Sequence, residues 1–169
     1  ELTRLEAFAN SAPYFMTESG YVSGGTNATA EQLKSSAVDK YTAYLTKVVE
    51  HLESEYGVSF DTIDPFNEPN TNYWKTTIDS STGSVSGSQE GMHVSPTMQQ
   101  TVIASLASKL GDSSTTTKAK IAAMDETNPA TFVTDWSAYS DSAKSSVEQL
   151  NTHAYSSGDR LQVRDYAKT

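Results

Sequence analysis

Residues 60–70 read FDTIDPFNEPN and give the first indication of the fold. The run over 58–63 is rich in β-branched and aromatic residues, which is typical of a strand. The motif Asn67-Glu68-Pro69 follows directly, and proline stops the strand because it has no N–H to donate to a sheet. The sequence therefore predicts a strand over 58–63 that presents the carboxylate of Glu68 beyond its C-terminal end.

Short apolar runs alternate with amphipathic segments along the rest of the chain. Further strands are predicted over Leu5–Phe8, Lys120–Met124 and Val147–Tyr155. Helices are predicted over Ala37–Tyr56, where Tyr41, Leu45, Val48 and Leu52 recur at helical spacing, over Ser95–Leu110, from Asn128-Pro129 through Trp136, and from about Arg160 onward. Alternation of this kind implies an α/β fold with a parallel sheet and right-handed crossovers.

Side chains able to carry chemistry follow all of these strands. They are Asn10 and Tyr14 after the first strand, Asn67 and Glu68 after the second, Asp125 and Glu126 after the third, and His153 and Tyr155 at the end of the fourth. One such coincidence would mean little, because Asn and Asp favour loops for local reasons. The C-terminal ends of parallel strands meet at one edge of a sheet, so this pattern predicts a single site there.

Composition excludes several classes of partner. With 21 acidic against 12 basic residues, the net charge is −9, so no basic field favours nucleic acid or an anionic membrane. No apolar run approaches the roughly 18 residues of a membrane span, and the first residues lack the pattern of a signal peptide. The absence of cysteine excludes thiolate metal sites, and the three histidines lack ligand spacing, so neither metal nor cofactor is expected. A neutral partner and, from the richness in Ser, Thr, Asn and Tyr, an extracellular location fit best.

Five stretches carry a resemblance to a known family. They are EAFANSAPYFMTESGYVSGG (6–25), DPFNEPNTNYW (64–74), GSQEGMH (87–93), AAMDETN (122–128) and LNTHAYSSGDR (150–160). In this order they resemble glycoside hydrolase family 30, and within it the endo-β-1,6-galactanases and related secreted β-1,6-glycanases. Many barrel glycosidases share Asn-Glu-Pro, whereas the YFMT and GSQEG matches are more specific. The resemblance implies part of a (β/α)8 TIM barrel, approximately strands three to six with their helices.

The resemblance also implies a retaining hydrolase that cleaves β-1,6-linked galactan or glucan, with Glu68 as general acid/base. A poly- or oligosaccharide would be its substrate, and its oligomeric state is left open. The implied substrate contacts are Asn67 to the hydroxyl next to the reacting carbon, His153 and Tyr155 at the cleavage subsite, Trp74 and Tyr14 as flat faces for sugar C–H surfaces, and Asn10 and Glu90 as polar wall.

The second carboxylate that such an enzyme needs has no counterpart in the chain. The family places the nucleophilic glutamate after the seventh strand, whereas the sequence ends at Thr169, before that strand. Strands one, two, seven and eight also lack counterparts. Residues 1–169 are therefore expected to be an internal fragment of one catalytic barrel, inactive in isolation.

Two alternatives stay open, and a third does not fit the sequence. Glu126 would be the nucleophile if the chain were complete; otherwise Asp125 and Glu126 orient neighbouring groups or cap the following helix. A non-catalytic carbohydrate-binding or remnant half barrel would keep the aromatic residues and leave Glu68 idle. A doubly wound nucleotide-binding domain would need a glycine-rich turn such as G-x-G-x-x-G, which the glycines of residues 20–25 do not form.

Overall fold

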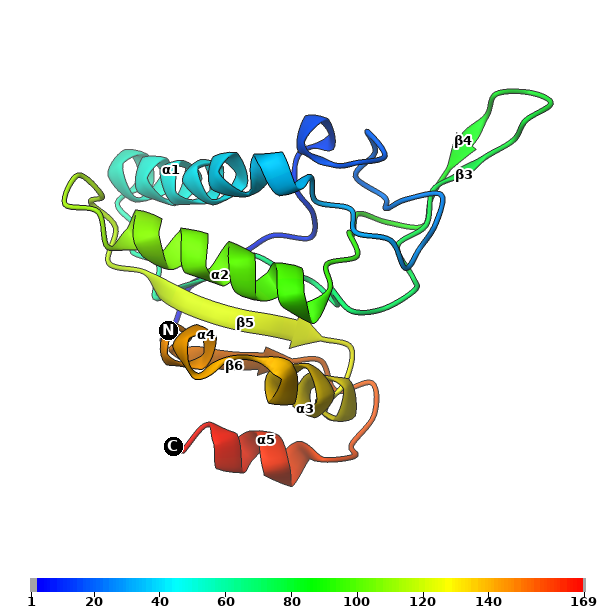
Figure 1. Ribbon diagram of the computed structural model, residues 1–169. Helices are drawn as coiled ribbons and strands as arrows, with labels where there is room; N and C mark the ends of the chain where they lie inside the picture. The colour runs from blue at the N-terminus through cyan, green and yellow to red at the C-terminus, as the bar shows by residue number, and fades with distance from the viewer. Residues whose placement is uncertain (1–2, 169) are drawn as a thin grey trace.

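The computed structural model describes residues 3–168 and contains one four-stranded parallel sheet (Figure 1). Its strands are β1 (Glu6–Phe8), β2 (Thr62–Asp64), β5 (Lys120–Glu126) and β6 (Gln149–Thr152), and they lie side by side in this order. Every neighbouring pair is parallel. The predicted α/β class and parallel sheet are confirmed.

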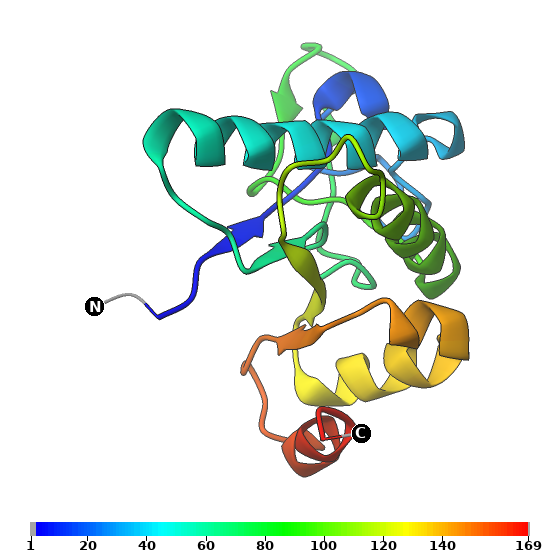
Figure 2. The ribbon, with the colours of Figure 1, turned by 90° about the vertical axis from the view of Figure 1, so that its left-hand side faces the viewer.

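Helices connect consecutive strands and lie along one side of the curved sheet (Figure 2). They are α1 (Val38–Tyr56), α2 (Pro96–Leu110), α3 (Pro129–Ala138), α4 (Asp141–Ser145) and α5 (Arg160–Tyr166), with short 3-10 turns at Tyr14–Met16 and Ser35–Ala37. None of the helices between residues 3 and 168 has both the length and the apolar character needed to cross a bilayer.

The helix ends follow from local chemistry, as predicted. The Ser95 hydroxyl accepts a hydrogen bond from the amide of Met98 at 3.3 Å, and Pro96 takes the first helical position of α2. Asn128 caps α3 in the same way. Gly57 ends α1 in the left-handed conformation, with φ at 65°, which glycine adopts without a Cβ clash.

Several element boundaries differ from the prediction. Strand β2 begins at Thr62 rather than residue 58, and β6 ends at Thr152, so Tyr155 lies in the following loop. Helix α1 buries Tyr41 and Leu45 as predicted, but at the next turn it buries Val49 and leaves Val48 37 % exposed. Helix α4 and the hairpin described next were not predicted.

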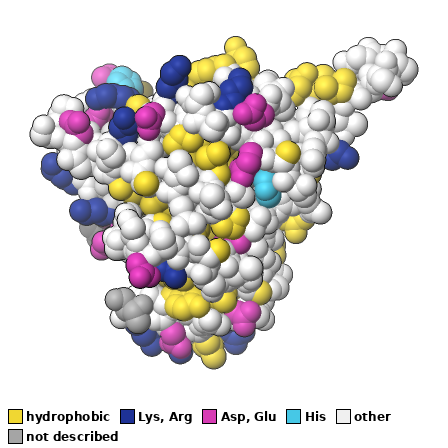
Figure 3. Space-filling view, in the orientation of Figure 1, with side chains coloured by type: hydrophobic (Ala, Val, Ile, Leu, Met, Phe, Trp, Pro, Cys, Tyr) yellow, Lys and Arg dark blue, Asp and Glu magenta, His cyan; other side chains and the backbone are white. Residues whose placement is uncertain are grey.

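The hairpin of β3 (Thr77–Ile78) and β4 (Val85–Ser86) projects from the body on the side toward which β5 and β6 point, at the upper right of Figures 1 and 3. Its strand residues are exposed, and the tip shows mainly uncharged polar atoms (Figure 3). It extends the edge of the sheet at which the candidate site residues gather.

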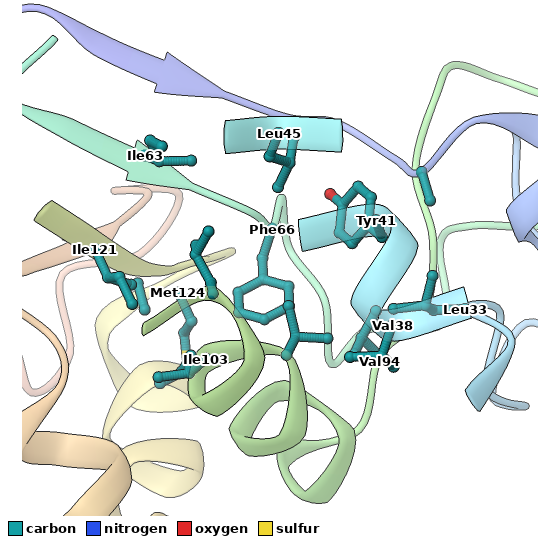
Figure 4. Packing of buried hydrophobic residues seen from close by; sticks show 14 of the residues in the cluster. Leu33, Val38, Tyr41, Leu45, Ile63, Phe66, Val94, Ile103, Ile121 and Met124 are labelled. Carbon is teal, nitrogen blue, oxygen red and sulfur yellow. The ribbon is translucent and has the colours of Figure 1, made fainter. Parts of the chain in front are cut away.

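The hydrophobic core fixes the segment that leads to Glu68. Phe66 is fully buried between α1, α2 and the sheet, where it lies near Leu45, Ile103 and Met124 (Figure 4). The hydroxyl of Tyr41, on α1, donates to the carbonyl of Pro65 at 2.7 Å. Fully burying a side chain of this size stabilises a fold by about 1.5–3 kcal/mol, so the residues just before Asn67 are firmly anchored.

The opposite face of the sheet is polar. Glu6 on β1 accepts hydrogen bonds from Thr62 at 2.6 Å and from Asn151 on β6 at 2.9 Å, and Asn151 also donates to Asp64 at 2.9 Å. Burial raises the pKa of Asp64 well above its usual value, and the nearby Asp125 charge adds to this. This side-chain network joins the first and last strands across the concave face.

Candidate active site

Glu68 stands at the C-terminal end of β2 and is 6 % exposed. Its carbonyl accepts from the indole Nε1 of Trp74 at 2.9 Å and from the hydroxyl of Thr71 at 3.1 Å. Its amide donates to the carbonyl of Asp125 at 2.9 Å. These three bonds hold the backbone that carries the carboxylate, so the side chain starts from a fixed position.

Two residues at this edge have left-handed backbones, Glu68 with φ at 45° and Asp125 with φ at 54°. Such a conformation costs a non-glycine residue on the order of 1 kcal/mol, and it persists only where the surroundings enforce it. At Asp125 the cause is a register shift between Met124 and Glu126 in the pairing of β5 with β6. The shift places Asp125 outside the regular ladder and redirects its side chain.

The side chains of Glu68, His153 and Asp125 form a continuous chain. The Nδ1 atom of His153 lies 2.7 Å from Oε1 of Glu68, and its Nε2 atom lies 3.2 Å from Oδ2 of Asp125. Burial raises the pKa of Asp125, and the charge and hydrogen bond of His153 partly offset this. An imidazole between two carboxyl groups can deliver or remove a proton at Glu68, and both carboxyl groups fix its orientation.

A pocket of about 410 Å³ opens in front of Glu68 and His153. Asn67, which is 4 % exposed, and Tyr155, which is 78 % exposed, line it as well. The ring of Tyr155 stands edge-on to His153, with centroids 5.5 Å apart. Among the described lining residues, Glu68 carries the single carboxylate. The structure thus brings together Asn67, Glu68, His153 and Tyr155, as predicted from the strand ends.

Trp74 lines the same pocket, as expected, but most of its surface is packed against the loop. It is 3 % exposed, and a Cβ atom at Gly91 would overlap its ring, so Gly91 packs directly against the indole. Gly24, with φ at 100°, approaches the carbonyl of Trp74 just as closely. The indole therefore supports the backbone of Glu68 and leaves little of its surface open to a sugar, because Gly91 packs on its ring.

Three other expected residues lie outside this pocket. Asn10 and Glu90 line a separate pocket beside β1 and α1, next to Phe8 and Val48. Tyr14 is 61 % exposed, and the structure places it against Phe15 at a centroid distance of 5.4 Å. No local pattern in the sequence indicated that these three residues lie outside the pocket in front of Glu68.

Glu126 points away from the pocket into a buried polar cluster. It accepts hydrogen bonds from the amides of Asn70 at 2.7 Å and Thr127 at 3.1 Å. The side chain of Asn70 donates to Asp135 at 2.7 Å. Burial, with the neighbouring Asp135 charge, raises the pKa of Glu126 to about 8, and burial also raises the pKa of Asp135. Glu126 is thus placed to orient the loop after Glu68 rather than to attack a substrate.

Sequence reasoning missed Tyr73, Ser88, Gln89 and Thr127, which complete the lining. Tyr73 stands perpendicular to Trp74, with ring centroids 6.2 Å apart, and is 54 % exposed. Its position directly before the tryptophan in the DPFNEPNTNYW stretch was the available signal. Across residues 3–168, no group of three or more His, Cys, Asp and Glu side chains is arranged to hold a metal ion.

Comparisons with known proteins agree with this architecture. The model of "O-Glycosyl hydrolase family 30" matches residues 2–157. An exo-β-1,6-galactobiohydrolase from Bifidobacterium longum subsp. longum is 38 % identical over 99 % of this chain and 13 % of its own length. An endo-β-1,6-galactanase from Hypocrea rufa is 26 % identical over 90 % of this chain and 29 % of its own length. The chain thus spans less than a third of either relative.

Solved structures share the fold. SrfJ from Salmonella typhimurium superimposes with a TM-score of 0.74 over 98 % of this chain and 33 % of its own, at 14 % identity. The endo-β-1,6-glucanase BT3312 gives 0.70 over 98 % and 35 %, at 15 % identity. A conserved exported protein from Bacteroides fragilis gives 0.59 over 73 % and 22 %, at 25 % identity.

Proposed function

Because the chain belongs to glycoside hydrolase family 30, we propose that it is part of a retaining enzyme that cleaves β-1,6-linked galactan, with Glu68 as its general acid/base. The observation that carries this proposal is the carboxyl group of Glu68, held 2.7 Å from His153 at the wall of an open pocket. The names of the two sequence relatives favour galactan over glucan as the substrate.

In this proposal Glu68 protonates the oxygen of the leaving sugar as the glycosidic bond breaks, and later removes a proton from the attacking water. Asn67 binds the hydroxyl next to the reacting carbon, a contact that strengthens as positive charge develops in the transition state. Tyr155 and His153 form the wall of the cleavage subsite. These groups act on a neutral sugar, in line with a pocket that contains no lysine or arginine among its described lining residues.

His153 links Glu68 to Asp125 and gives the acid/base a partner for both of its tasks. When Glu68 has lost its proton, Nδ1 of the imidazole donates a hydrogen bond to the carboxylate. When Glu68 carries its proton, Nδ1 accepts that hydrogen bond while Nε2 stays against Asp125. Asp125 contacts the far nitrogen of the ring, so we assign it a positioning role. Glu126 accepts a hydrogen bond from the amide of Asn70 and so holds that loop in place from the buried side.

Retaining hydrolysis needs a nucleophilic carboxylate about 5–5.5 Å from the acid/base. We propose that residues of the full-length enzyme beyond the C-terminal side of this chain supply it, and that residues 1–169 form strands three to six of a single (β/α)8 barrel. The fold similarity to the longer SrfJ and endo-β-1,6-glucanase BT3312 and the polar face of the sheet support this arrangement. We propose an extracellular location for the enzyme, as expected for one that meets a polysaccharide.

The test is hydrolysis by the full-length protein that carries this segment. We expect release of galactose-containing oligosaccharides from β-1,6-galactan, slower or no release from β-1,6-glucan, and products that initially have the β configuration in proton NMR spectra. Products of the α configuration would refute a retaining mechanism. Cleavage of glucan in preference to galactan would refute the substrate assignment.

A second candidate is carbohydrate binding without hydrolysis. The presence of a single carboxylate among the described residues of the pocket favours it. A full-length protein that binds β-1,6-galactan in pull-down assays but releases no sugar on prolonged incubation would support this candidate over the enzyme.

A further inference from the structure

A second pocket, of about 520 Å³, adjoins the one in front of Glu68. Tyr73 and Thr127 line both pockets, so the two form one continuous depression across the loop after β2 and the start of the loop after β5. Asn72, His93 and Asn128 line the second pocket alone. Its described lining has amide and hydroxyl groups, one imidazole and one phenol ring, and no carboxylate, lysine or arginine.

The walls of this second pocket are held from behind. The Nδ1 atom of His93 lies 2.9 Å from the carbonyl of Thr71, and His93 is 7 % exposed. The backbone and side chain of Asn70 are bound by the buried carboxyl groups of Glu126 and Asp135. The polar groups of the pocket are therefore preorganised, as a binding site for a polar neutral ligand requires.

Thr127 supplies an independent sign of a ligand. Its side chain lies at the junction of the two pockets and is 7 % exposed, and its hydroxyl has no hydrogen-bond partner among the described residues. Buried hydroxyl groups nearly always have a partner, because leaving one unpaired costs free energy. A sugar hydroxyl bound at this junction would supply the missing partner.

Tyr73 supplies a flat surface at the same junction. Its ring is 54 % exposed and rests edge-on against the buried Trp74, which in turn holds the carbonyl of Glu68. A planar ring anchored in this way can cover the C–H face of a sugar ring at little conformational cost. It therefore offers far more exposed ring surface for stacking than Trp74, which is 3 % exposed.

We propose that the second pocket is a further sugar-binding subsite, in which Tyr73, Thr127 and Asn72 hold a sugar unit next to those bound at Glu68. The inference rests on the proposed function and adds to it the use of longer, neutral β-1,6-linked oligosaccharides. The subsite adjoins the pocket in front of the acid/base and shares Tyr73 and Thr127 with it, so a longer sugar chain bound at Glu68 would reach it. Affinity should therefore rise with the length of the oligosaccharide.

The experiment uses the full-length protein with Glu68→Gln, which prevents turnover. Isothermal titration calorimetry gives the affinities for β-1,6-linked galactobiose and galactotetraose. We expect Tyr73→Ala to lower the ratio of the tetraose affinity to the biose affinity about tenfold. Asn72→Ala and the similarly shaped Thr127→Val should each lower it about threefold to fivefold. Tyr56→Ala, an exposed tyrosine at the far end of α1, serves as the matched control and should leave the ratio unchanged.

The outcomes separate the two proposals. If the unmodified enzyme cleaves β-1,6-galactan but the affinity ratio stays constant in Asn72→Ala and Thr127→Val, the subsite is refuted while the function stands. If the enzyme neither cleaves nor binds β-1,6-galactan, the proposed function fails and the subsite falls with it. Should Tyr73→Ala fail to fold by circular dichroism, the Asn72 and Thr127 variants decide the question, because both are mild changes.

Discussion

The replacement Glu126→Gln probes the buried carboxyl groups of Glu126 and Asp135, which bind Asn70 in the loop after Glu68. The pKa of Glu126 rises from 4.5 to about 8 in the folded protein, chiefly through burial. The folded state therefore binds this proton more tightly than the unfolded state, and stability falls as pH rises from about 4.5 to about 8. At 1.36 kcal/mol per pKa unit, a pKa difference of about 3.5 can lower the free energy of unfolding by at most about 5 kcal/mol over this pH range. Because Glu126 and Asp135 interact and do not titrate independently, we expect the free energy of unfolding to fall by about 3 kcal/mol.

Urea unfolding at pH 5 and pH 8, followed by the fluorescence of Trp74 and Trp136, measures this loss. We expect Glu126→Gln, which mimics the neutral acid, to reduce the difference in unfolding free energy between the two pH values by about 3 kcal/mol. Comparing the difference between the two pH values, rather than the stability at one pH, removes any pH-independent destabilisation caused by the glutamine side chain. Glu55→Gln, on the exposed side of α1, is the control and should keep the full difference. An equal pH dependence in the Glu126→Gln variant and the unmodified protein would refute a protonated Glu126.

Two further predictions concern the support of the site. Gly91→Ala forces a Cβ atom into the ring of Trp74 and should destabilise the protein by about 1–3 kcal/mol. Gly158→Ala, with open space around it, is the control and should leave the stability unchanged. Equal losses of stability for both variants in thermal melts would count against this packing. Asp125→Asn removes the charge at the far nitrogen of His153. This variant should lower kcat about tenfold and change KM less than twofold. A rise in KM with kcat intact would instead assign Asp125 to substrate binding.

The parts of the site that the sequence could predict are those set by strand direction. Glu68 and His153 each follow a strand, and parallel strands end at one edge, so their meeting did not depend on distant details. The helix ends at Gly57 and Ser95 were equally local, because capping involves only neighbouring residues.

The remaining parts depend on contacts between residues far apart in the chain. Trp74 is buried because Gly91 packs on it from the other end of a long loop without periodicity. The position of Asp125 follows from a shift in the pairing of β5 with β6, which no single strand encodes. That same shift turns Glu126 to the buried cluster, away from the side on which Asp125 lies. Tyr73 is the exposed ring of the pair because the indole of Trp74 is packed inside the loop.

The central claim is that Glu68 donates the proton to the leaving sugar. Its most direct test compares two substrates in the full-length enzyme with Glu68→Ala: β-1,6-galactan and an aryl galactobioside whose leaving group needs no proton. We expect turnover of galactan to fall by about 10²–10⁴, while release of the aryl group in the first turnover falls far less. Equal losses on both substrates, or galactan turnover that is unchanged, would contradict the assignment.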